Sequence, residues 1–335
     1  MTWTFILSAI AGVVLGRLAA GWAAEAVADV SSTGLRRCSQ CQTAFSKVQR
    51  WLSLCTIRCR NCRQRQTIFW PLGAAAGLAV VFVAYAWLLT VAQCQHIGEV
   101  RPATPMHLLR LPFHLAFLFL LAAATLTDLL DYVIPDEVIG MGILFSVIGA
   151  TISGDLQIIH IWVNWDAEVP GLEGPYLPEW MKHHRHLHGF AWSLTGLVVG
   201  ATFIWLVRAI SGGILGQPAM GFGDVTLMAM IGAFMGWQPA LCVIALAPAT
   251  AVVVGLLVRL FTGRGFVAFG PYLALSALIV LSGWRWLWAR PLLLRDVFSH
   301  WPSTLGLAGG ALVALIVLLG GLRLFRTVPV DTIRS

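Results

Sequence analysis

Long apolar stretches recur along the whole chain and constrain its fold more than any other feature. A helix needs about 20 apolar residues to cross the hydrocarbon core of a bilayer. Stretches near or above that length fall at about 3–24, 68–92, 108–127, 138–154, 188–210, 240–260, 266–283 and 303–325, with a shorter one at 225–237. With 58% hydrophobic residues, 11% charged residues and a mean hydropathy of +0.81, the chain does not have the composition of a soluble domain. We therefore expect an all-α polytopic membrane protein of about eight or nine transmembrane helices, in contact with the lipid bilayer.

The basic residues indicate how these spans are oriented. If the amino terminus lies outside, 14 of the 22 lysines and arginines fall on the inner side, eight of them in residues 36–65. Basic loops of membrane proteins face the cytoplasm, so this topology accounts for the formal net charge of +7. Nucleic-acid binding is not expected, because the basic residues mostly flank spans and lack an aromatic stacking platform.

Four cysteines in the loop after the first span form two C-x-x-C pairs, Cys38 with Cys41 and Cys59 with Cys62. The pairs are separated by 17 residues, a spacing typical of zinc sites. Four thiolates would close the tetrahedral shell, so the zinc would be structural rather than catalytic. Two disulfides are the alternative, but a basic, cytoplasmic loop lies in a reducing compartment. A loop of this size needs a metal or disulfides to fold, because it cannot bury a core of its own.

Two aspartates lie where apolar stretches begin or end. Asp224 follows Gly221 and Gly223 in "MGFGDVTLMAMIGAFMGW", and Asp128 ends the third long stretch in "LTDLLDYVIPDEV". A carboxylate in a membrane normally has a polar partner. On the inferred topology both aspartates face the cytoplasmic side, where they can share a single proton, the arrangement with which aspartic proteases hydrolyse peptides. The glycines would let a substrate backbone approach and would allow unusual torsions before the helix.

Other polar residues have simpler explanations. Asp131 and Asp136 can assist catalysis, but solvated acids at helix ends are the commoner case. The run "HHRHLH" offers four histidines as metal ligands, yet an ordinary polar loop is favoured over a metal site. The histidines are His183, His184, His186 and His188.

In this combination of motifs the sequence resembles the prepilin peptidases, the G-x-G-D membrane aspartyl peptidases that cut leader peptides from type IV prepilins and type II secretion pseudopilins. The family's first catalytic aspartate precedes a Pro-Asp pair by seven residues, as Asp128 precedes Pro135 and Asp136, and its second falls on Asp224. "GAFMGWQPAL" and "FGPYLAL" resemble the family's usual continuation. The resemblance implies a bacterial inner-membrane enzyme whose site faces the cytoplasm. We expect the apolar helix of a prepilin or pseudopilin precursor to enter between spans, so that only the leader junction reaches the carboxylates.

The sequence departs from this family at several places. Thr226 stands where members often have a lysine. Bifunctional members also methylate the new amino terminus with S-adenosylmethionine, but their signatures are missing from the first span, and Gly73 and Ala74 replace an expected acid. A methyltransferase activity is therefore not supported, and the use of S-adenosylmethionine stays open.

These observations divide the chain into four parts and leave two rival functions. We expect a first span (1–30), a cytoplasmic zinc loop (31–67), a peptidase core (68–283) with an external insertion at about 155–187, and an interfacial segment with an additional span (284–335). A proton-coupled transporter is one alternative, but its relay acids would lie at the midplane of two related halves. A catalytically inactive scaffold for pilus or secretion assembly is the other. The oligomeric state is not indicated.

Overall fold

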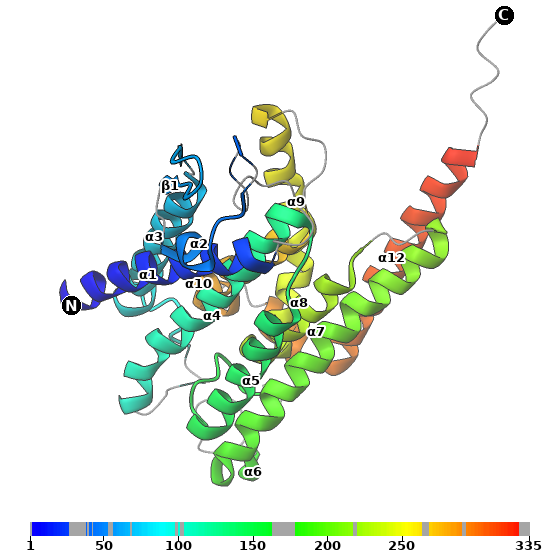
Figure 1. The fold of residues 1–335 in the computed structure, drawn as a ribbon. Coiled ribbons are helices and arrows are strands. Elements are labelled where there is room, and N and C mark those ends of the chain that lie inside the picture. Colours follow the sequence, from blue (N-terminus) through cyan, green and yellow to red (C-terminus); the bar gives the residue numbers. More distant parts are fainter. Residues whose placement is uncertain are drawn as a thin grey trace, which may run out of the picture.

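The computed structural model is a bundle of long helices with one small hairpin (Figure 1). It describes residues 2–26, 38, 40–41, 43–52, 56–67, 69–97, 100, 104–162, 178–216, 220–262, 268–289 and 293–327. The elements in chain order are α1 (Thr2–Ala26), α2 (Lys47–Leu52), β1 (Thr56–Arg58), β2 (Arg65–Thr67), α3 (Trp70–Thr90), α4 (Thr104–Asp131), α5 (Asp136–Ser153), α6 (Glu179–His183), α7 (Arg185–Leu215), α8 (Phe222–Met235), α9 (Trp237–Thr262), α10 (Gly270–Ala289), α11 (Leu293–Ser299) and α12 (Trp301–Thr327).

Within the described residues, seven helices are long and apolar enough to cross a membrane: α1, α3, α4, α5, α7, α9 and α12. The prediction of an all-α polytopic membrane protein is confirmed. The expected span at 266–283 corresponds to α10, which is not among the seven. Its 20 residues include Arg285 and three tryptophans, and two of these, Trp284 and Trp288, are buried. Part of the run expected to lie at the membrane interface therefore packs inside the bundle.

The short helix α8 lies at the centre of the bundle. It has 14 residues, and all of those from Asp224 to Met235 are buried except Thr226. The helices α5, α7, α9 and α10 pack around it. Phe234 of α8 stacks on Phe117 of α4 with a centroid distance of 3.8 Å, and on Phe113 at 4.8 Å. Because α8 makes its contacts with protein on all sides, a helix of roughly 21 Å does not need to match the bilayer thickness.

Small residues allow the helices beside α8 to approach closely. Gly196 of α7 and Gly232 of α8 meet backbone to backbone, and a Cβ at either position would collide with the carbonyl of the other. The Ser193 hydroxyl of α7 also donates to the Ala233 carbonyl at 2.6 Å. Without a hydrophobic driving force between helices in lipid, such close contacts and interhelical hydrogen bonds are what hold spans together.

A tight break separates α8 from α9. Gly236 has a φ of 81°, a conformation that side chains rarely adopt, and a Cβ there would collide with the Trp192 indole. The chain therefore turns within one residue into α9. This break fixes the length of α8 and so the depth of its first turn.

The histidine-rich segment is helical rather than a loop. His183 ends α6, and His186 and His188 lie in the first turn of α7. His188 is buried and accepts a hydrogen bond from the Ile161 backbone N–H at 3.1 Å. Residues 163–177 of the predicted insertion lie outside the described residues.

Candidate active site

The two predicted aspartates come from helices far apart in the sequence. Asp128 lies in the last turn of α4, and Asp224 lies in the first turn of α8. Both side chains are buried, with 5% and 7% of their surface exposed. They are close enough to interact electrostatically. The structure therefore places at one site the carboxylates that the sequence predicted to meet.

Asp224 is held by the start of its own helix. Gly221 is the residue that precedes α8, and it lies beside the Asp224 carboxyl. An acid three residues after the N-cap commonly reaches back in this way, because the first N–H groups of a helix have no partner inside it. The Thr226 hydroxyl, where related sequences often have a lysine, donates to the Gly223 carbonyl at 3.0 Å. It thus bonds within its own helix.

Asp128 is held by a helix that the sequence did not connect to the site. Gly270 is the first residue of α10, and it lies directly against the Asp128 carboxyl. A Cβ at position 270 would collide with that carboxyl. The positive end of the α10 dipole also faces Asp128, which favours a negative charge there. The "FGPYLAL" run contains this glycine, but nothing in the pattern indicates which carboxylate it meets.

Ile134 fills the space between the two glycine positions. Its side chain lies 3.3 Å from where a Cβ would stand at Gly223, and 3.2 Å from where one would stand at Gly270. The apolar side chain borders both helix starts and helps to keep the site dry. Sequence reasoning missed Ile134, because an isoleucine in a connecting segment carries no chemical signal.

The roles expected of Gly221 and Gly223 are only partly as predicted. Gly221 is extended, with φ −68° and ψ 157°, and neither glycine has a positive φ. The expectation of unusual torsions at these glycines is therefore wrong. What Gly223 provides is space, because a side chain there would press on Ile134.

The two neighbouring acids lie at helix ends. Asp136 is exposed and begins α5 directly after Pro135, where the helix dipole favours a negative charge. Asp131 is the last residue of α4 and is partly buried. No contact in the described part of the chain connects either acid to the carboxylate pair.

The four cysteines gather at a second site outside the bundle. Their Sγ atoms all lie within 4.8 Å of one another, with Cys38 and Cys62 3.4 Å apart and Cys41 and Cys59 3.4 Å apart. All four are free thiols. Thiolates at roughly 2.3 Å from a tetrahedral ion lie about 3.8 Å apart, so the arrangement fits a metal ion.

Each cysteine pair lies in its own turn, and the two turns have the same hydrogen-bond pattern. The backbone N–H of Cys38 donates to the Thr43 carbonyl at 2.9 Å, and that of Cys59 donates to the Gln64 carbonyl at 2.9 Å. The second turn closes the β1–β2 hairpin. Hydrogen bonds from the Thr43 hydroxyl and backbone lower the pKa of Cys41 to about 6, which favours the metal-binding thiolate. Within the described residues, no other cluster of histidines, cysteines or acids is arranged to hold a metal, so the histidines of α6 and α7 form no such site.

Comparison with known proteins agrees with the motifs. Residues 180–256, which run from α6 into α9 and include Asp224, match the type IV leader peptidase family. The predicted resemblance to this family is confirmed. A prepilin leader peptidase/N-methyltransferase of Pseudomonas putida is 25% identical over 253 residues, which cover 72% of this chain and 71% of that protein.

Shorter matches to other type IV leader peptidases are more similar. A prepilin leader peptidase/N-methyltransferase of Dickeya chrysanthemi is 36% identical over 100 residues, covering 28% of this chain and 35% of that protein. One of Stutzerimonas stutzeri is 35% identical over 92 residues, covering 27% and 32%. These two matches span about a third of each relative. No solved structure matches the chain.

Proposed function

We propose that this chain is a membrane aspartyl endopeptidase that removes the leader peptide from type IV prepilins or type II secretion pseudopilins. The observation that carries the proposal is the buried pair of Asp128 and Asp224, which interact electrostatically although 95 residues of sequence separate them. The relatives' names supply the substrate class. The family match supports a peptidase, and the carboxylate pair supports the aspartic mechanism.

The pair can perform hydrolysis without a covalent enzyme intermediate. One carboxylate removes a proton from water, whose oxygen attacks the scissile carbonyl carbon, while the other carboxyl gives its proton to the carbonyl oxygen. As the C–N bond then breaks, the leaving nitrogen takes up a proton from the pair. Because water supplies both the oxygen of the new acid and the proton of the new amine, no other reactant is needed.

The site should open to the cytoplasm of a bacterial inner membrane. The positive-inside assignment puts the end of α4 and the start of α8 on the same side as the arginine-rich cysteine loop. We propose that this loop holds a structural zinc ion, because tetrahedral coordination by four thiolates is typical of zinc. We propose the same domain boundaries as those expected from the sequence.

Methyl transfer is not part of the proposal. The names of the relatives include an N-methyltransferase. The resemblance leads us to expect an acid near position 73 for that activity. Residue 73 is instead an exposed glycine of α3 with open space around it.

The test is co-expression with a prepilin, followed by mass spectrometry of the product. Asp128→Asn and Asp224→Asn should each reduce leader removal by at least about 10²-fold, because an amide cannot take up or give the proton. Glu137→Gln is the matched control, because Glu137 is an exposed acid in the first turn of α5. This variant should process the precursor as the wild type does. Unchanged processing in either aspartate variant would leave transport or a scaffold role as the better account.

A further inference from the structure

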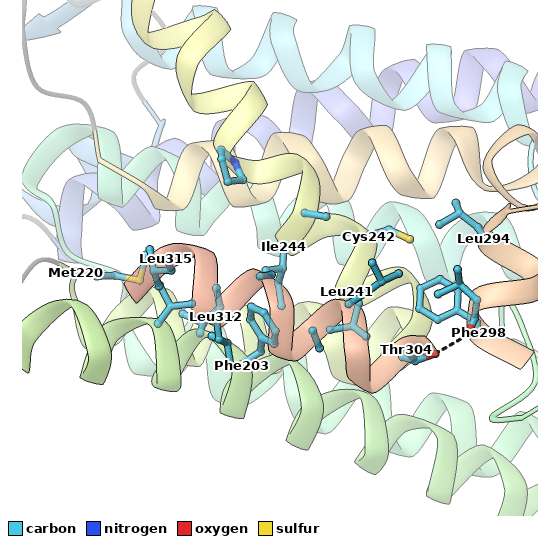
Figure 2. A pocket seen from close by; sticks show the side chains of 18 of the residues that line it. Phe203, Met220, Leu241, Cys242, Ile244, Leu294, Phe298, Thr304, Leu312 and Leu315 are labelled. Carbon is cyan, nitrogen blue, oxygen red and sulfur yellow. Dashed lines mark hydrogen bonds between the residues drawn. The ribbon is translucent and has the colours of Figure 1, made fainter. Parts of the chain in front are cut away.

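An apolar chamber lies between four helices of the carboxy-terminal half. Its volume is about 540 Å³, and its walls come from α7, α9, α11 and α12. Figure 2 shows Met220 and Leu315 at one end, and Leu294, Phe298 and Thr304 at the other. The chamber is thus elongated along α12, and its volume is in the range of ligand pockets.

The chemistry of the walls selects an apolar occupant. The lining side chains are aliphatic, aromatic or sulfur-containing, with Thr304 as the exception. The Thr304 hydroxyl already donates to the Val297 carbonyl at 2.6 Å. A polar ligand would lose its hydration without gaining hydrogen bonds from these walls, and that loss is costly.

One end of the chamber adjoins the carboxylate pair. Met220 and Phe269 line the chamber, and they directly precede Gly221 and Gly270, the two residues beside the Asp224 and Asp128 carboxyls. The chamber wall therefore begins one residue away from each of these two glycines. The far end lies beside α11, so a chain that runs from the carboxylates along the chamber would run across the membrane.

The outer wall of the chamber is a loosely packed helix. None of the residues in the apolar stretch of α12 is buried, whereas 61% of those in the apolar stretch of α4 are buried. The helix α12 lies along α7 (Figure 1), and it also contacts α11. On the opposite wall, Pro248 interrupts the hydrogen bonding of α9. An apolar segment can therefore enter sideways from the lipid by moving α12.

We propose that this chamber binds the apolar helix of the precursor that follows the cleavage junction, an inference that rests on the proposed function. A helix about 10 Å wide does not fit wholly inside. It instead lays one row of side chains into the chamber, as helices do in apolar grooves. Proximity to the carboxylate pair favours this occupant over a lipid chain, which has no reason to end there.

Cross-linking to Cys242, a natural residue of the chamber wall, tests the contact directly. Single cysteines are placed at successive positions of the apolar helix in a cysteine-free precursor, which is co-expressed with the Asp224→Asn variant to prevent cleavage. Mild oxidation should form disulfides at positions about 3.6 residues apart, since a disulfide needs Cα atoms within about 7 Å. Cys242→Ala should abolish them, and a cysteine in the leader should give none.

A variant with a larger side chain in the chamber provides a kinetic test. Ala308→Phe on the inner side of α12 should raise KM for the intact precursor about tenfold with kcat unchanged, equivalent to about 1.4 kcal/mol of binding. Ala314→Phe is the control, because Ala314 is exposed on the same helix and does not line the chamber. Equal thermal stability of the two variants excludes misfolding.

The outcomes separate this inference from the proposed function. If the wild type removes the leader but no cross-link to Cys242 forms, the chamber does not bind the precursor helix. Equal KM values for the two α12 variants lead to the same conclusion. Neither result contradicts the proposed peptidase activity. Cross-links without leader removal by the wild type overturn the peptidase. Recovery of lipid alone from the chamber also counts against the precursor.

Discussion

At the scale of single residues, the space beside Asp128 depends on Gly270. A methyl group there collides with the carboxyl, so Gly270→Ala should displace the catalytic group while the hydrophobic core stays intact. We expect leader removal to fall at least about tenfold, a loss of about 1.4 kcal/mol of transition-state stabilisation. Initial rates of precursor cleavage by the purified variant measure this.

Gly283 provides the matched control on the same helix. A Cβ at this position meets only the far end of the Leu287 side chain, 4.0 Å away. Gly283→Ala should therefore cleave at the wild-type rate. If both variants retain full activity, Gly270 does not position Asp128 as described.

Residue motifs predicted that Asp128 and Asp224 would lie at one site, but they did not predict the surroundings of this site. Asp128 and Asp224 could be found because a carboxylate beside an apolar span is costly and therefore conspicuous. Gly270 and Ile134 could not, because their roles exist only after α10 and the segment between α4 and α5 have come together. The torsions expected at Gly221 and Gly223 were wrong for the same reason, since the need there is for space and not for a positive φ.

At the scale of elements, the depth of Asp224 depends on the contact between α7 and α8. Gly196→Ala would force these helices apart, because its Cβ overlaps the Gly232 backbone, which cannot move aside cheaply. We expect a loss of roughly 1–3 kcal/mol, typical of overpacking. A lower Tm of the purified protein in detergent measures it. Gly213→Ala, in open space on α7, should leave Tm unchanged, and equal Tm values would contradict the close packing.

At the same scale, we expect the fold of the hairpin to depend on a metal. Purified wild-type protein should contain about one zinc ion per chain, and Cys38→Ser should lose it, because three thiolates no longer close the tetrahedral shell. Elemental analysis by mass spectrometry measures the content. Cys242→Ala should keep its zinc, since Cys242 lies in the chamber wall. Wild-type protein purified without chelators and free of zinc would refute the site.

Elements differ in how far the sequence predicts them. The gathering of the four cysteines follows from their local spacing, so this cluster was predictable residue by residue. The short length of α8 was visible in its sequence, whereas its burial on all sides was not. Apolar composition alone does not tell a lipid-facing helix from one surrounded by protein, which is why α10 was expected to be an ordinary span and instead buries Trp284 and Trp288.

At the scale of the whole molecule, α12 is separable from the catalytic bundle. Its apolar part has no buried residues, so lipid can replace it at little cost. A chain ending at residue 300 should insert into the membrane and keep its carboxylate pair. It should cleave a short peptide that spans the leader junction within about twofold of the full chain, because such a peptide has no apolar helix for the chamber to bind. An unfolded or inactive truncated protein would show that α12 supports the bundle.

The central claim is that two remote carboxylates form one catalytic unit. The most direct test compares precursor cleavage by purified wild type, Asp128→Asn, Asp224→Asn and the double variant. Residues that act as a unit lose nearly everything with the first substitution, so all three variants should fall to the same background rate. A single variant that cleaves like wild type, or a double variant far slower than both single variants, would contradict the shared site.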